Sequence, residues 1–141
     1  MKKSVLYIIF TLIFFLNTSN AELMSSYNKT LVDNLITSND KIAAAIGNMG
    51  DEQYVSCTFA AIQIGTWESL GETFDEMVII QWRLALESAN YYKANQATKG
   101  IPNSYYDALI KAGTAQMAAQ GQSYTTNAIR DCKENFLMKL F

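Results

Sequence analysis

Histidine is absent from this chain of 141 residues, and proline and cysteine are scarce, with one and two copies respectively. Without histidine, the chain lacks the commonest general base and the commonest metal ligand of proteins. Catalytic triads of the Ser-His-Asp or Cys-His type and histidine-rich zinc sites are therefore excluded. We expect no catalytic residues, no metal ligands and no cofactor, and we do not expect an enzyme.

Clusters of basic residues are missing as well. The chain carries 11 Lys and Arg against 13 Asp and Glu. If the N-terminal Lys2 and Lys3 are removed, 9 basic residues remain and the net charge is −4. Nucleic acids and anionic membrane surfaces attract clustered Lys and Arg. The charge balance therefore argues against nucleic acid as a partner.

The first 21 residues have the pattern of a secretory signal peptide. Lys2 and Lys3 precede an apolar run over residues 5–16, and a short polar stretch then ends with Ser19 and Ala21 at the small-residue positions of a cleavage site. The run is shorter than the roughly 20 apolar residues that a membrane span needs. We predict cleavage after Ala21, no stable membrane insertion, and a periplasmic or secreted protein of the bacterial envelope.

Residues 22–141 predict a single all-α domain, a compact bundle of about four to five helices that follows the cleaved signal peptide. Strand-like alternation is scarce, whereas Ala, Leu, Met, Glu and Gln are abundant and favour helices. Apolar residues at helical spacing predict a first helical region over residues 23–49 and a second helix from near Asp51. A third helix around Trp82 is apolar on most sides and should be central. A fourth surrounds Gly113, and a last one follows Gly121.

Local signals indicate the helix boundaries and the buried faces. Asn39 lies in a polar interruption of the first region and can cap a restarted helix. Thr73 and Glu76 match a capping box for the third helix, and Ser123 can cap the last one. The predicted core stripes of the first and last regions are Leu31, Leu35, Ile42, Ile46 and Met49, and Ile129, Cys132, Phe136 and Leu140.

The two cysteines, Cys57 and Cys132, lie 75 residues apart in the part of the chain that we expect to reach an oxidising compartment. Each falls on the predicted core-facing stripe of its helix. We therefore predict a disulfide between them. The chain-entropy description assigns such a loop about 4 kcal/mol of stabilisation. Free thiols and an intermolecular bridge are the alternatives.

Three acidic residues, Glu68, Glu72 and Glu76, follow one another at intervals of four. If one helix continued through Gly71, they would share a face and form an acidic ridge that could bind a partner. The alternative is a helix break at Gly71, with the acids serving only the dipole of the next helix. Acid–base chemistry by a pair of these carboxylates is the third and least favoured option.

Two pairs of adjacent tyrosines flank the loop over residues 93–104. Neighbouring residues on a helix cannot both face the core, so at least one tyrosine of each pair should lie at the rim. Because tyrosine is enriched at binding hot spots, the pairs are candidate partner-binding residues. The alternative is that they only cover the underside of the loop, with their hydroxyls in water. The four residues are Tyr91, Tyr92, Tyr105 and Tyr106.

In outline, the chain resembles the small exported helical proteins with one disulfide that bacteria use as periplasmic immunity proteins, inhibitors or chaperones. The resemblance covers the whole chain and rests on no motif of a single family. Together with the expected export and the acidic charge, it favours a protein that binds another protein, such as an immunity or inhibitor protein. A carrier of a small apolar ligand between helices and an envelope chaperone are the alternatives. A homodimer is left open.

Overall fold

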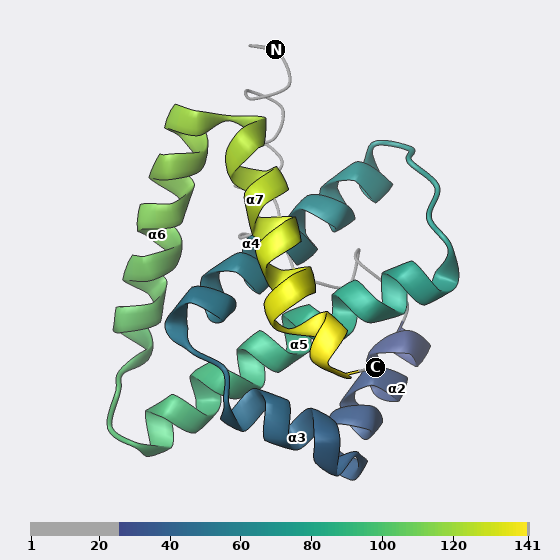
Figure 1. The fold of residues 1–141 in the computed structure, drawn as a ribbon, viewed down its shortest axis with the longest axis vertical. Helices are drawn as coiled ribbons and strands as arrows, with labels where there is room; N and C mark the ends of the chain where they lie inside the picture. The colour runs from purple at the N-terminus through teal and green to yellow at the C-terminus, as the bar shows by residue number, and fades with distance from the viewer. Residues whose placement is uncertain (1–25, 141) are drawn as a thin grey trace.

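The computed structural model of the protein describes residues 26–140. One disulfide joins two helices at the middle of the fold. Helix α4 (Asp51–Ser69) carries Cys57 and helix α7 (Gln122–Asn135) carries Cys132. The Cα atoms of the two cysteines lie 4.9 Å apart, and both side chains are fully buried. The predicted disulfide is confirmed, and it fixes α7 across α4 (Figure 1).

The regular structure of residues 26–140 is entirely helical, as the composition predicts. Six α-helices and one 3-10 turn replace the expected four to five helices, because the first predicted region is two helices. Asn39 separates them, and its side-chain oxygen accepts hydrogen bonds from the N–H groups of Lys41 and Ile42. The elements besides α4 and α7 are α2 (Ser26–Ser38), α3 (Asp40–Gly47), α5 (Glu76–Thr98), α6 (Asn103–Gln120) and η2 (Leu137–Leu140).

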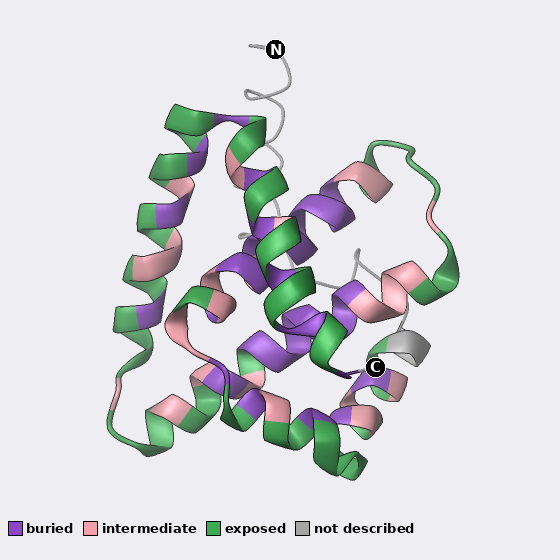
Figure 2. Ribbon diagram, in the orientation of Figure 1, coloured by how far each residue is buried: buried purple, intermediate pink, exposed green. Residues whose placement is uncertain are grey.

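Helix α5 is the central helix, as its all-round apolar pattern predicts. Residues 82–89 are all buried, and α5 packs on α4, α2 and α3. Figure 2 shows the buried parts of α4 and α5 meeting at the centre, while most of α6 faces solvent. The buried stretch of α5 also holds an ion pair between Arg83 and Glu87 at 2.8 Å, with both side chains less than a tenth exposed.

The predicted caps of the third and last helices are wrong. Helix α5 begins at Glu76 with Asp75 in the capping position, because the chain leaves α4 through Gly71 (φ 101°) and residues up to Asp75 stay outside the helix. Thr73 therefore lies two residues too early to cap it. Helix α7 begins at Gln122, one residue after Gly121, so Ser123 is already inside its first turn.

The buried stripe of the first helix is shifted by one residue from the predicted one. Val32 and Ile36 are buried in α2, whereas Leu31 and Leu35 are only partly buried. One residue rotates a helix by about 100°, so a wide apolar stripe can face the core along either edge. The rest of the stripe is confirmed, since Ile42, Ile46 and Met49 are buried.

The predicted signal peptide, residues 1–21, lies outside the described residues. Within residues 26–140, none of the helices combines the length and the hydropathy that crossing a bilayer requires.

Candidate functional site

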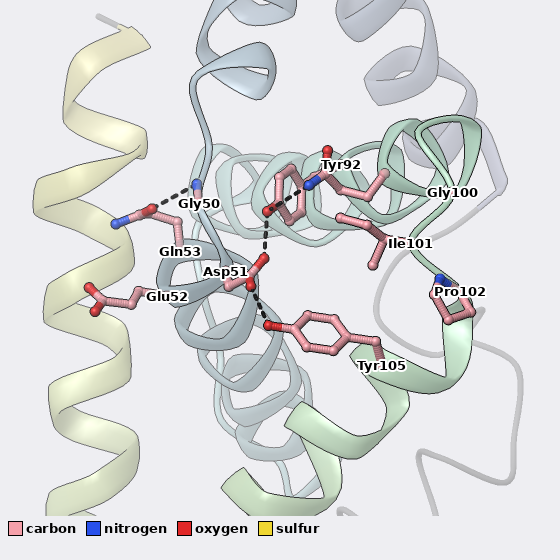
Figure 3. A pocket seen from close by; sticks show the side chains of 10 residues that line it. Gly50, Asp51, Glu52, Gln53, Tyr92, Gly100, Ile101, Pro102 and Tyr105 are labelled. Carbon is pink, nitrogen blue, oxygen red and sulfur yellow. Dashed lines mark hydrogen bonds between the residues drawn. The ribbon is translucent and has the colours of Figure 1, made fainter.

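Two parts of the chain that are distant in the sequence, residues 50–53 and residues 92–105, meet at the first turn of α4 and line an open pocket of about 810 Å³. Residues 50–53 line it from α4, and Tyr92 and Gln96 line it from the end of α5. The loop over residues 100–102 lies opposite, followed by Tyr105 at the start of α6 (Figure 3). The α5–α6 turn thus brings the ends of these helices to the start of α4.

The carboxylate of Asp51 accepts hydrogen bonds from three tyrosine hydroxyls at this pocket. Its Oδ1 accepts from Tyr92 at 2.6 Å and from Tyr106 at 3.1 Å. Its Oδ2 accepts from Tyr105 at 2.8 Å (Figure 3). A carboxylate offers about four acceptor positions, so one position on Oδ2 is left for a further donor.

The rings of these tyrosines pack on one another and hold the carboxylate in place. Tyr106 is fully buried, and its ring meets those of Tyr54, Tyr92 and Tyr105 edge-on, with centroids 4.9, 5.7 and 5.0 Å away. Edge-to-face pairs of this kind add stabilisation to the burial of the rings. The acceptor atoms of Asp51 are therefore set in position before any ligand arrives.

At this site the pKa of the Asp51 carboxyl group is lowered, whereas the pKa values of neighbouring tyrosine hydroxyls are raised. Burial on its own would raise the pKa of Asp51, but the hydrogen bonds from Tyr92, Tyr105 and Tyr106 hold it below its ordinary value. Burial, together with the bond to Asp51, raises the pKa of Tyr92, and burial raises that of Tyr54 to about 12. At neutral pH the Asp51 carboxylate is therefore an anion, and Tyr92 donates to it as a neutral phenol.

The pocket carries net negative charge. Asp51 and Glu52 are both in the first turn of α4, and none of its described lining residues is a lysine or arginine. A helix N-terminus contributes only about half a positive charge, which two carboxylates outweigh. Lys93 of α5, the residue after Tyr92, is already paired with Asp107 at 3.0 Å. A carboxylate beside tyrosine rings is an arrangement that suits a cation.

In each predicted pair of tyrosines, one residue is buried and its neighbour is more exposed, as expected for adjacent residues on a helix. Tyr92 and Tyr106 are buried, Tyr91 is partly buried, and Tyr105 is 44% exposed. Three of the four hydroxyls converge on one carboxylate, which the tyrosine pattern alone does not reveal. Their role in partner binding stays a prediction.

The three predicted acidic residues do not form a ridge on one helix. Glu68 is in the last turn of α4, Glu72 is in the connecting turn, and Glu76 is the first residue of α5. The helix breaks after Ser69, as the alternative reading of Gly71 expects. One carboxylate oxygen of Glu68 is buried without a hydrogen bond among the described residues, and burial raises the pKa of this group. Partner binding by these residues stays a prediction.

Asp51 and Glu52 are the site residues that the sequence reasoning missed. In the sequence they indicate only the start of a helix, where acidic residues are common because they interact favourably with the helix dipole. The available signal was the combination of an acidic helix start with two tyrosine pairs, but its meaning depends on how three helices pack.

No group of three or more Cys, Asp or Glu side chains that could hold a metal ion occurs within residues 26–140. Comparison with known proteins finds no matching family model, no similar curated protein and no similar solved structure.

Proposed function

We propose that the protein acts by binding another protein, as an exported immunity or inhibitor protein does, and that the Asp51 pocket is the centre of its binding surface. The observation that carries this proposal is the Asp51 carboxylate, which three tyrosine hydroxyls hold at the wall of an open, negatively charged pocket. The matching group of the partner is a lysine or arginine side chain.

The geometry favours recognition because the receiving groups are already fixed. The ring of Tyr106 is buried among the other tyrosines, so little side-chain freedom is lost when a ligand binds. A basic side chain in the pocket meets the free acceptor position of Asp51 and the ring face of Tyr105. Both a hydrogen bond to a charged acceptor and a cation–π contact stabilise such a complex.

The lowered pKa of Asp51 supports binding over acid–base chemistry. A general acid or base works best when its pKa lies near the working pH. The tyrosine hydroxyls move the pKa of Asp51 in the opposite direction, further from neutrality. A permanent anion is suited to hold a cation.

The test is capture of the partner from the envelope fraction of the source organism by the purified exported protein, followed by binding measurements on the captured protein. Glu52→Lys reverses an exposed charge that lines the pocket without touching the tyrosine hydrogen bonds. It should slow association by about tenfold or more at low salt, because charges at the edge of an interface act mainly on association. Asp51→Asn should mainly speed dissociation.

Glu134→Lys is the matched control, since Glu134 is an exposed acid of α7 that does not line the Asp51 pocket. It changes the net charge by the same amount and should leave binding within about twofold, because screening reduces distant surface charges. Equal losses for the Glu52 and Glu134 variants would show that only overall charge matters. A partner whose affinity ignores both Asp51 and Glu52 would contradict the proposal.

A further inference from the structure

A second pocket, of about 690 Å³, lies at the opposite ends of the same two central helices. Ile64 and Trp67 line it from the end of α4, and Val78 and Trp82 line it from the start of α5. Ile129 completes this apolar wall from α7. None of its described lining residues is an aspartate or glutamate. Its size lies within the range of about 300–1,000 Å³ that small-molecule sites occupy.

Both tryptophans of the chain line this one pocket. Trp82 is 7% exposed and belongs to the core, whereas Trp67 is only partly buried and packs against that core. Met138, which is 59% exposed, lines the pocket from η2. An exposed methionine beside two indole rings forms an adaptable apolar surface. The pocket therefore offers apolar contact over most of its wall.

A single charged residue, Lys133 of α7, lines the pocket. Lys133 is exposed and forms no ion pair with any residue from 26 to 140. A lysine can lay its aliphatic stem along an apolar wall while its ammonium group stays at the solvent edge. The pocket thus combines an apolar interior with one unpaired positive charge.

We infer that this pocket binds a small amphipathic anion, a molecule with a medium-length hydrocarbon chain and a carboxylate head. The chain lies against Trp67, Trp82 and Ile129, and the carboxylate pairs with the ammonium group of Lys133. The charge of the head distinguishes this site from the Asp51 pocket, whose carboxylate would repel the same ligand. The inference is independent of the proposed protein binding, because the two pockets share no described residue.

Intrinsic tryptophan fluorescence tests the inference directly, since the only two tryptophans are both at the site. The probe is dodecanoate, added to the purified disulfide-bonded protein below the concentration at which dodecanoate forms micelles. A saturable change in tryptophan emission is expected. Dodecyltrimethylammonium has the same tail and the opposite charge, and acetate has the same head without the tail. Both should bind several-fold more weakly than dodecanoate.

Two exposed lining residues provide variants that leave the core intact. Lys133→Gln should raise the half-saturation concentration of dodecanoate about threefold to fivefold, the upper part of the range of an exposed ion pair. Lys111→Gln, on α6 outside the pocket, is its matched control and should have no effect. Met138→Gln should weaken binding, whereas Met77→Gln, at an equally exposed methionine outside the pocket lining, should not.

Three results would overturn the inference. The first is an unchanged emission when dodecanoate is added. The second is binding of dodecyltrimethylammonium as tight as that of dodecanoate, together with no effect of Lys133→Gln. The third result is a change of emission with protein concentration alone, accompanied by a dimer in sedimentation, which would assign this face to a second copy of the chain.

Discussion

The two ends of the α4–α5 pair present opposite chemistry on one scaffold. At one end, the start of α4 and the end of α5 enclose Asp51 with tyrosine hydroxyls and leave a negative pocket. At the other end, the end of α4 and the start of α5 place Trp67 and Trp82 around an apolar pocket with one lysine. Figure 1 shows the two helices side by side and running in opposite directions, so that each end of the pair combines the start of one helix with the end of the other.

A carboxyl group at each end of this helix pair shows what sets the direction of its pKa shift. Asp51 and Glu68 both belong to α4 and both are partly buried. The pKa of Asp51 is lowered because three hydroxyls stabilise its anion, whereas burial without a hydrogen bond among the described residues raises the pKa of Glu68. Burial alone therefore does not determine the charge of a carboxyl group. The donors within reach determine it.

Removal of the disulfide should have the largest effect and should fall more heavily on the tryptophan end. The double variant Cys57→Ala, Cys132→Ala should lose about 2–5 kcal/mol of unfolding free energy, as small secreted domains do. Because α7 supplies Ile129 and Lys133 to the apolar pocket and no residue to the Asp51 pocket, tryptophan emission should change before the tyrosine signals. Urea unfolding followed with both probes measures this.

Coincident transitions for tryptophan and tyrosine in that double variant would contradict the expected difference between the two ends. Cys57→Ser, Cys132→Ser serves as a second version of the same change, with a different side chain at the two buried positions.

The tyrosine hydroxyls that donate hydrogen bonds to Asp51 should contribute unequally to the free energy of unfolding. Tyr92→Phe removes a buried 2.6 Å hydrogen bond to a charged acceptor and should cost about 1.5–3 kcal/mol. Tyr105→Phe removes a 2.8 Å bond to the same carboxylate at the solvent edge, so its loss should be smaller. Chemical denaturation of both variants gives the comparison, and Tyr91→Phe is the control on the same helix. Equal losses of unfolding free energy for Tyr92→Phe and Tyr105→Phe would mean that burial does not determine how much each hydrogen bond stabilises the fold.

The pH dependence of stability should have opposite signs for the two carboxyl groups of α4. The folded-state pKa of Asp51 is lowered, so its contribution is present above the ordinary aspartate pKa of about 3.9 and is lost as the pH falls through the folded value. The folded-state pKa of Glu68 is raised, so its contribution is present below the ordinary glutamate pKa of about 4.3 and is lost as the pH rises through the folded value.

Denaturation of Asp51→Asn and Glu68→Gln between pH 3 and pH 7 tests these signs. At neutral pH, Asp51→Asn should lose about 1 kcal/mol, the scale of a hydrogen bond. Glu68→Gln should gain less than about 1 kcal/mol, because solvent screens a partly exposed group. Both differences should shrink as the pH falls below the range in which the groups titrate. A stability loss for Glu68→Gln at neutral pH would show that its anion has a stabilising contact.

The sequence predicted the features that depend on local pattern. The start of α4 at Asp51, the cap at Asn39 and the inward position of both cysteines follow from helical spacing and from residue types. Thr73 and Ser123 were wrongly predicted as caps because each lies two residues after a glycine with positive φ, where the turn conformation decides where the helix restarts.

The two pockets could not be predicted in the same way. The hydroxyls that bind Asp51 come from residues 41, 54 and 55 positions further along the chain. Their convergence depends on the angles between α4, α5 and α6, which no single-helix pattern encodes. Likewise, Trp67 and Trp82 are 15 residues apart on different helices, and only the packing of α4 on α5 places them at one site.

The most direct test of the central claim is a titration of the nitrogen-15-labelled protein with N-acetyl-lysine methylamide, followed by NMR. The amide signals of Gly50, Asp51 and Tyr105 should shift in a saturable manner, while the indole signals of Trp67 and Trp82 stay in place. N-acetyl-norleucine methylamide, which lacks the ammonium group, should leave the same amides unchanged. Equal shifts with both compounds, or shifts only at the tryptophan end, would contradict a pocket that binds the basic side chain of a partner.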